Sequence, residues 1–381
     1  MKPESPSEEI LPLTGLRFVA ALYVFIFHID MRWPLAPESG FFSNLISQGA
    51  VGMSLFFVLS GFVLARRYGD GSGDYRAYLV NRLSRIYPIY LVVAILTIPW
   101  MGISLESDSA YGLFRQIAMA GTLIAVDTLL IQAWFPQLFA LWNNGGSWSI
   151  SVEAFCYVLL PFILVALARR SDRTVKQVAL AAYALAVIPG LTLILFYGTH
   201  GLAFYSMPIY RLPEFVLGVC TALAATRLTV SPGRAAALQL AAMSALIVYL
   251  GFIGPKLPMW ITHNWIVLPV IAITIFTTAQ SFGVLSKLLS VAPMVWAGKI
   301  SYSFYSFQLL VLLFLKSHHA ALVVQLPALS DNRLLLLAAF AVLMVLSAAG
   351  YHLIEEPMRI LLKRRMGRTA TAAARPIPAA A

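Results

Sequence analysis

The chain is dominated by apolar stretches that are long enough to cross a lipid bilayer. About 20 predominantly apolar residues suffice for a helix to span the hydrocarbon core. Inside lipid a segment must satisfy its own backbone polar groups, so these stretches predict helices. The fold class is therefore an all-α polytopic membrane protein. The candidate segments lie at roughly 13–31, 48–66, 79–101, 112–134, 147–168, 174–197, 205–226, 234–254, 260–280, 294–316 and 332–361.

The composition supports this class. Hydrophobic residues make up 60% of the chain and charged residues 11%, whereas soluble domains are about 25% charged. The net charge of +11 does not indicate nucleic acid as a partner, because the basic residues cluster at predicted helix ends, as in cytoplasmic loops. The expected surroundings are membrane lipids. The two cysteines, Cys156 and Cys220, lie inside predicted spans and do not support a disulfide.

Loop charges decide which segments cross. The arginine-rich loops 66–85 and 169–176 are both expected on the cytoplasmic side. Two loops on one side need an even number of spans between them, yet three candidates lie there. The weakest is 112–134, which contains Arg115 and Asp127. We expect it to be a re-entrant or interfacial segment on the extracytoplasmic side. About ten transmembrane helices remain, with both termini cytoplasmic, in the cytoplasmic (inner) membrane.

The chain shows no repeat of 20–50 residues and no soluble appendage. We therefore expect a single transmembrane domain over 1–367. The Ala/Pro-rich residues 368–381 are expected to form a disordered tail.

Two ionisable residues stand inside the first apolar stretch. Arg17 and His28 are eleven residues apart, which places them on one helix face and about 16 Å apart along the axis. Ionisable groups in a span are costly and mark functional sites by default. We expect Arg17 to bind an anion near the cytoplasmic end and His28 to act as a deeper general base. The structural alternative is a snorkelling arginine and a hydrogen-bonded histidine.

Further cations follow at the cytoplasmic ends of other spans. Arg82 and Arg85 share a helix face in the block Asn-Arg-Leu-Ser-Arg-Ile-Tyr-Pro, and Lys299 opens the segment at 294–316. Arginine binds phosphate in a bidentate fork, so these residues are candidates to bind a phosphorylated ligand. Ordinary anchoring by cytoplasmic positive charge is the alternative.

Polar residues also gather near the outer ends of two spans. Ser149 and Glu153 share a helix face, and Trp148 fits an interfacial belt. Arg211 and Glu214 are three residues apart on one face. Each set can bind a substrate, and an internal ion pair is the alternative for Arg211 and Glu214. Frequent polar residues from Lys299 to Gln308 indicate that one face of that helix lines a cavity. No histidines have metal spacing, so no metal site is assigned.

In order along the chain, these blocks resemble the integral-membrane acyltransferases called acyltransferase type 3. The shared features begin with Arg-x10-His of the first span, GMSLFFVLSGFVL and Arg-x-x-Arg-Ile-Tyr-Pro. They continue with Trp-Ser-x-Ser-Val-Glu, Arg-Leu-Pro-Glu-Phe, Ile-Ser-Tyr-Ser-x-Tyr and Glu-Glu-Pro. Two positions depart from the family pattern: Ala154 replaces a second acid and Gln308 replaces a histidine.

The resemblance implies transfer of an acyl group, usually acetyl, from cytosolic acyl-CoA to a hydroxyl of an extracytoplasmic or lipid-linked carbohydrate such as an exopolysaccharide. Acyl-CoA would be a co-substrate, with no tightly bound cofactor. On this hypothesis Arg17, Arg82, Arg85 and Lys299 bind acyl-CoA, and His28 is the base, oriented by Glu153. The acceptor would contact Trp148, Ser149, Arg211 and Glu214. The alternative function is a proton-coupled transporter or lipid flippase that uses the same buried ionisable residues.

Overall fold

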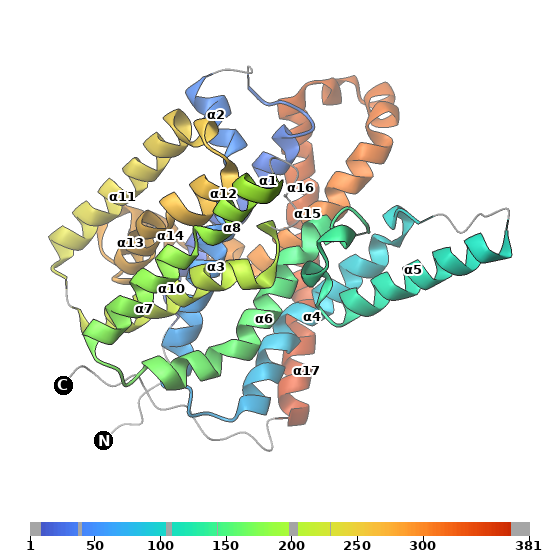
Figure 1. The fold of residues 1–381 in the computed structure, drawn as a ribbon. Coiled ribbons are helices and arrows are strands. Elements are labelled where there is room, and N and C mark those ends of the chain that lie inside the picture. The colour runs from blue at the N-terminus through green and yellow to red at the C-terminus, as the bar shows by residue number, and fades with distance from the viewer. Residues whose placement is uncertain are drawn as a thin grey trace.

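The computed structural model describes residues 9–36, 40–103, 109–142, 144–197, 205–228 and 230–366. Its regular structure in these residues is helical, without a strand (Figure 1). The predicted tail 368–381 lies outside the described residues. The all-α class is confirmed.

Ten membrane crossings can be formed by the described helices, as predicted. Nine helical segments are individually long and apolar enough, and a tenth is a pair of helices bent by 42°. The first six crossings are α1 (Leu11–Asp30), α3 (Val51–Tyr68), α4 (Tyr75–Leu96), α6 (Asn144–Leu167), α7 (Asp172–Leu185) with α8 (Ile188–Thr192) and η4 (Leu193–Tyr197), and α10 (Pro208–Arg227). The last four are α11 (Pro232–Phe252), α12 (Met259–Ile261) with η7 (Thr262–Ile266) and α13 (Leu268–Ala279), α15 (Ala292–Gln325), and α16 (Asn332–Gly350) with η9 (Tyr351–Glu355) and α17 (Glu356–Met366).

Shorter elements connect these crossings. They are α2 (Phe41–Ser47), η1 (Ile98–Trp100), η2 (Gln132–Trp134), η3 (Pro136–Leu138), η6 (Gly254–Lys256), α14 (Gly283–Leu289) and η8 (Pro327–Ser330). α15 is longer than the predicted 294–316, because its apolar run continues past Lys316 and no proline interrupts it before Pro327. His318 and His319 therefore lie on this helix.

An ion pair shows that the segment between α4 and α6 does not cross. Arg169 Nη2 donates to Asp70 Oδ2 at 2.9 Å, which joins the loop after α3 to the residues after α6. The chain between them must therefore make an even number of crossings, and α4 and α6 are the two. Arg227 binds the same region through the carbonyl of Ala168 and the carboxylate of Asp172. We call this end of the bundle the basic end.

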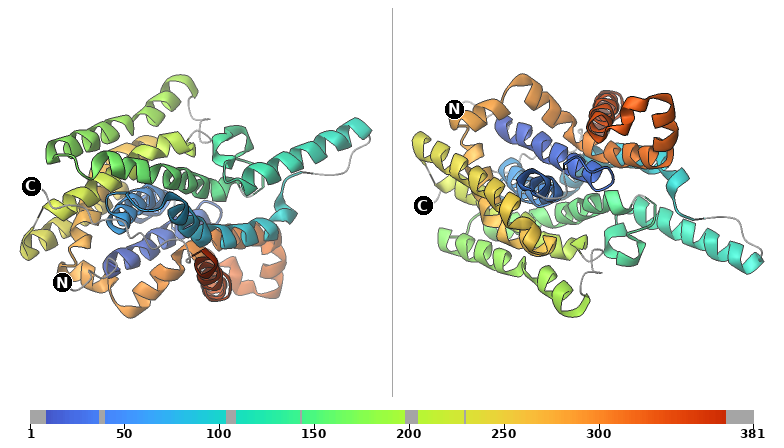
Figure 2. Two further views of the ribbon diagram at one scale, coloured as in Figure 1. Left: turned by 90° about the horizontal axis from the view of Figure 1, so that it is seen from below. Right: turned by 90° about the horizontal axis from the view of Figure 1, so that it is seen from above.

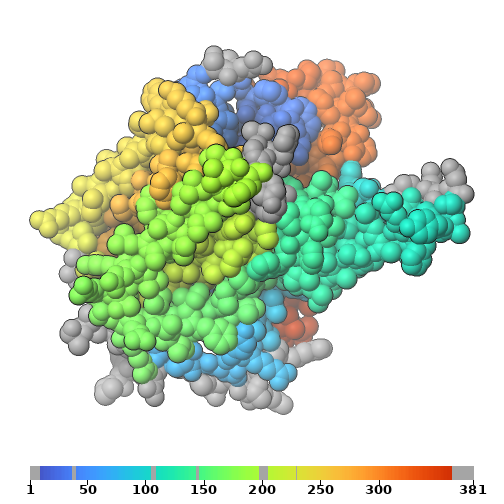
Figure 3. Space-filling model, in the orientation of Figure 1, coloured from blue at the N-terminus to red at the C-terminus, as the bar shows by residue number. Residues whose placement is uncertain are grey.

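The remaining helix of that segment, α5 (Ala110–Thr128), does not meet the criteria for a spanning helix. It extends sideways from the bundle in all three ribbon views and stands out in the space-filling view (Figures 1, 2 and 3). Three of its residues are buried, and all lie near its C-terminal end: Leu123, Val126 and Asp127. The prediction that this segment does not cross is confirmed, and its form is a laterally projecting helix.

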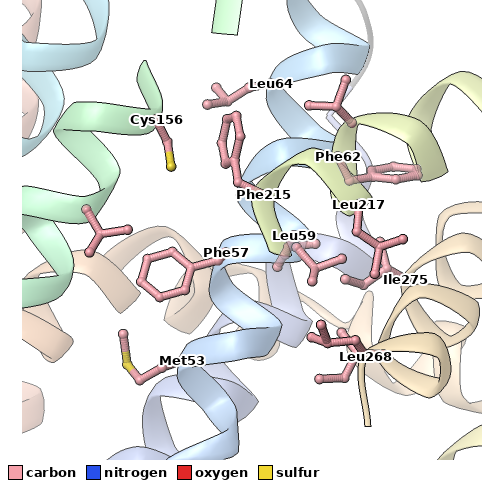
Figure 4. Packing of buried hydrophobic residues seen from close by; sticks show 14 of the residues in the cluster. Met53, Phe57, Leu59, Phe62, Leu64, Cys156, Phe215, Leu217, Leu268 and Ile275 are labelled. Carbon is pink, nitrogen blue, oxygen red and sulfur yellow. The ribbon is translucent and has the colours of Figure 1, made fainter. Parts of the chain in front are cut away.

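The core is built around α3, which packs against α1, α6, α10 and α13. Its apolar side chains meet those of α10, α6 and α13 in one cluster (Figure 4). α3 and α10 cross at two glycines. A Cβ built on Gly218 would lie 2.0 Å from the carbonyl oxygen of Val58, and one on Gly61 would lie 2.1 Å from that of Phe215. Such small residues let helix backbones approach closely in membranes.

α1 and α15 form the other close pair that positions the site. They run in the same direction, because Thr14 meets Gly298 near their first turns and His28 lies beside Gln308 near the other end of α1. The two phenylalanines Phe18 and Phe25 of α1 both contact the Phe304 ring edge-on. This register fixes which residues of α15 face Arg17 and which face His28.

We expect Gly218→Ala to disrupt the α3–α10 crossing, because its methyl group would overlap the backbone of α3. The expected loss of stability is about 3 kcal/mol, measured as a lower thermal unfolding temperature of the detergent-purified protein. Gly121→Ala is the matched control, since α5 leaves open space there. It should be neutral or stabilising by up to about 1 kcal/mol. Equal effects of the two substitutions would contradict this packing.

The Asp70–Arg169 pair predicts a pH-dependent stability. Burial alone would raise the pKa of the Asp70 carboxyl, but hydrogen bonds from Ser72 and Arg169 outweigh it and bring that pKa below its usual value. A lowered folded pKa adds stability that is present above the unfolded pKa of about 3.9 and is lost as the pH falls through the folded pKa.

Asp70→Asn should therefore lower stability at pH 7 by about 1 kcal/mol. The difference from the parent protein should shrink as the pH falls towards about 3, because the parent carboxyl then begins to take up its proton. Thermal unfolding at the two pH values measures both. A difference of the same size at both values would contradict the assignment.

Candidate active site

A buried cavity lies between α1, α3, α4, α6 and α15. Its wall contains polar and charged side chains from all five helices, together with apolar side chains that come mostly from α3. The polar and charged lining residues are Arg17, Ser60, Arg82, Arg85, Ser149, Glu153, Tyr157, Ser301, Tyr302 and Tyr305. The apolar ones are Met53, Phe56, Phe57, Leu59, Leu64, Ile86 and Ile150.

Three arginines converge on this cavity. Arg17 comes from α1, and Arg82 and Arg85 come from one face of α4, as the sequence predicted. Among the described residues, none of the three guanidinium groups has a partner in an ion pair or a hydrogen bond. Arg82 is 4% exposed, and its guanidinium lies over the Tyr68 ring with its carbon 5.3 Å from the centroid. The site therefore holds more positive charge than its protein neighbours compensate, which suits a polyanion.

Glu153 is the carboxylate in the cavity wall. It shares a face of α6 with Ser149, as predicted, and it interacts electrostatically with Arg85, Arg17 and Arg82. Tyr157, one turn further along α6, interacts with the same carboxylate. Glu153 is thus part of the arginine cluster.

His28 lies beyond the cavity, about three turns of α1 from Arg17. Its side chain interacts with Gln308 of α15 and with the cation of Arg32. Its Nδ1 atom is buried without a hydrogen-bond partner among the described residues. The structure does not bring Glu153 and His28 together, because Glu153 is placed at the level of Arg17. The polar side chain that interacts with the imidazole in this structure is Gln308.

A pair of hydroxyls separates the arginine cluster from His28. Ser149 Oγ lies 2.7 Å from the Tyr305 hydroxyl, which in turn donates to the carbonyl oxygen of Gly146 at 3.2 Å. Ser149 and Tyr305 line the cavity, and Gln308 follows Tyr305 by one turn of α15. The cavity therefore ends about one helical turn from the imidazole.

The other residues predicted to bind the acceptor form a closed cluster. Arg211 Nη1 donates to Glu214 Oε1 at 2.6 Å, and both side chains are fully buried. The rings of Tyr205, Phe57 and Trp148 surround the guanidinium, with its carbon 4.2, 5.2 and 5.4 Å from their centroids. Among these residues Phe57 also lines the cavity. Of the predicted acceptor residues, Ser149 alone borders the cavity, and Trp148, Arg211 and Glu214 lie behind Phe57.

Lys299 lies outside the cavity. Its Nζ is 3.8 Å from Glu9 Oε2, and both side chains are about half exposed at the basic end. The sequence analysis grouped it with the arginines because it lies at the predicted cytoplasmic end of its span. Its position on α15 instead directs it to the surface.

Several site residues were not identified individually from the sequence. Tyr302 and Tyr305 belong to the polar face that was expected to line a cavity, and this expectation is confirmed. Tyr157 could have been found from its i+4 spacing to Glu153. The contact of Gln308 with His28 had no local signal, because it depends on the register between two helices that are distant in sequence.

Comparison with known proteins identifies a family for the chain. The model of the acyltransferase 3 family, described as an acyltransferase domain, matches residues 11–352. The acyltransferase MdmB of Streptomyces mycarofaciens is 32% identical over 152 residues, covering 39% of this chain and 38% of MdmB. The O-acetyltransferase OatA of Staphylococcus aureus (strain NCTC 8325 / PS 47) is 24% identical over 381 residues, covering 93% of this chain and 58% of OatA.

This chain thus spans less than two thirds of the length of either relative. No solved structure matches it. Since the family model covers nearly the whole described bundle, the chain belongs to the acyltransferase 3 family, and its helices form an integral, multi-pass membrane domain.

Proposed function

We propose that this protein transfers an acyl group, most simply acetyl, from acyl-CoA to a hydroxyl of an extracytoplasmic or lipid-linked carbohydrate. The observation that carries the proposal is the set of three arginines, Arg17, Arg82 and Arg85, that line one cavity without a direct anionic partner among the described residues. The relative named as an O-acetyltransferase supports acetyl as the group and oxygen as the acceptor atom.

The donor would enter from the basic end, which we assign to the cytoplasm together with both termini, in the inner membrane. Its phosphates would bind the three guanidinium groups, which match phosphate oxygens in bidentate geometry. The pantetheine arm would then follow the cavity past Tyr302 towards Tyr305. The apolar lining from α3 suits this uncharged arm.

The acceptor would approach from the opposite end and meet the thioester near His28. Ser149, beside Tyr305, is the predicted acceptor residue placed to contact it. The closed cluster of Arg211, Glu214 and Trp148 would support the cavity wall through Phe57. The glycan that is modified would be an exopolysaccharide, a lipopolysaccharide or a similar molecule.

The chemistry requires one base. Neutral His28 would take the proton of the acceptor hydroxyl as its oxygen attacks the thioester carbonyl. The new C–O bond forms, the C–S bond breaks, and the imidazolium returns its proton to the leaving CoA thiolate. Gln308 would fix the orientation of the ring. Glu153, which lies among the arginines, would help to position the donor site. It would not orient the base His28.

The first test separates donor binding from transfer. Arg17→Gln should weaken acetyl-CoA binding by about tenfold or more, because it removes a charge-assisted phosphate contact. His28→Ala should leave that affinity unchanged and lower the acylation rate by about 10²–10⁴-fold. Binding is measured by calorimetry on purified protein, and acylation by mass spectrometry of surface glycans from cells expressing each variant.

Lys287→Gln is the control, since Lys287 is an exposed cation on α14 outside the cavity. It should change neither quantity. Undiminished glycan acylation by His28→Ala would exclude the general-base role. A parent protein that transports an acylated lipid but does not consume acetyl-CoA would favour the transporter alternative.

The second test concerns the ring contact of His28. Gln308→Leu should lower the acylation rate by about tenfold, because orientation of a general base is lost, while acetyl-CoA affinity stays unchanged. Gln308→His, which restores the residue common at this position in the family, should retain most of the rate. Gln239→Leu is a control for the loss of a buried glutamine, since Gln239 bonds Thr278 and Ser286 away from the cavity. It should lower stability but not the rate per folded molecule.

A further inference from the structure

A buried carboxylate behind the cavity wall has no part in the mechanism above. Glu355 is 3% exposed and accepts a hydrogen bond from Ser303 Oγ at 2.8 Å. It lies at the end of η9, a π-helical turn between α16 and α17 that packs against α4 and α15. Single π-helical turns inside α-helices occur frequently at functional sites.

The π-helical turn changes which acid faces the bundle. The spacing of Glu355 and Arg359 suggests an i, i+4 pair, but this expectation is wrong. Arg359 binds Glu356 at 2.6 Å instead, with both side chains about one third exposed. The wider turn and the missing N–H of Pro357 shift the register, so that Glu355 turns inward to Ser303.

Arg85 is influenced by two carboxylates. It interacts electrostatically with Glu355 and with Glu153. Arg85 and Glu153 both line the cavity, whereas Glu355 does not. One carboxylate therefore lines the cavity together with the guanidinium, and the other lies outside the cavity lining and accepts a hydrogen bond from Ser303.

The two carboxylates have opposite consequences for an incoming phosphate. A buried guanidinium seeks a counter-charge, because its desolvation is otherwise uncompensated. An ion pair between Arg85 and Glu153 would occupy the N–H groups that a phosphate needs. Attraction to Glu355 draws the cation back to the wall and leaves the cavity open.

We propose that Glu355 is a positioning residue that holds Arg85 at the cavity wall and keeps it from pairing with Glu153, so that the guanidinium is available to a phosphate of the donor. This inference rests on the proposed acyl-CoA site. It assigns no contact between Glu355 and the donor itself.

The test compares two neighbouring acids. Glu355→Gln keeps the size of the side chain and its acceptor for Ser303 but removes the charge. It should weaken acetyl-CoA binding by about tenfold, with glycan acylation at saturating donor nearly unchanged. Glu356→Gln should change the affinity by less than about twofold, since its partner Arg359 lies outside the cavity.

A double variant tests the mechanism directly. In the Glu153→Gln background no carboxylate can capture Arg85, so adding Glu355→Gln should cost little further affinity. A purely structural role of Glu355 would instead give additive losses, and additive losses would overturn the proposal. Equal effects of Glu355→Gln and Glu356→Gln would also overturn it.

Folding is checked by monodisperse elution and thermal unfolding of each variant. Should Glu355→Gln not fold, Ser303→Ala replaces it: the charge stays, but the carboxylate loses its hydrogen bond, and the affinity should fall in the same direction. Unchanged affinity in Ser303→Ala would then count against the proposal. A parent protein that binds no acetyl-CoA would refute the donor site itself, and this inference with it.

Discussion

Placing cationic groups inside an apolar bundle is the constraint on which the rest of this structure depends. A guanidinium in lipid is tolerated where a wet or polar cavity surrounds it. The protein meets this condition by gathering Arg17, Arg82 and Arg85 around one cavity that also holds Glu153 and several hydroxyls. The charges are only partly balanced, and the remaining positive potential is what makes the site able to bind a polyanion.

Two close helix pairs, α3 with α10 and α1 with α15, position the walls of the cavity. α3 and α10 cross at glycines that allow backbone contact, which brings Phe57 between the cavity and the buried Arg211. α1 and α15 run side by side, which gives the site its length, with Arg17 near one end of α1 and His28 near the other. The packing of α1 against α15 thus determines the distance between the donor site at Arg17 and the base at His28.

The sequence was sufficient for the fold class, the ten crossings and the exclusion of 112–134, because segment length and loop charge are local properties. It also predicted that Ser149 and Glu153 share a helix face, since that follows from helical spacing. It did not predict the partner of His28 or the position of Lys299. Both depend on how α15 is rotated against α1, and no spacing within one helix encodes that rotation.

The same distinction applies to the acids near the C-terminus. Regular i, i+4 spacing predicts that Arg359 pairs with Glu355. In the structure, which has a π-helical turn there, Arg359 pairs with Glu356 instead. A change of register by a single residue is invisible to a periodic pattern, yet it decides whether a carboxylate faces solvent or a buried arginine. Sequence reading is therefore least dependable where a helix departs from its own period.

The projecting helix α5 has a mechanical consequence. A buried network fixes its base: the Tyr90 hydroxyl donates to Asp127 Oδ1 at 2.9 Å, and Gln132 Nε2 donates to Ser147 Oγ at 3.1 Å. The part of this helix from 110 to 122 then extends about 18 Å from the bundle. A force on this helix, from lipid or from a neighbouring protein, would be transmitted through these hydrogen bonds to Ser147 in the first turn of α6. Glu153 follows on the same helix.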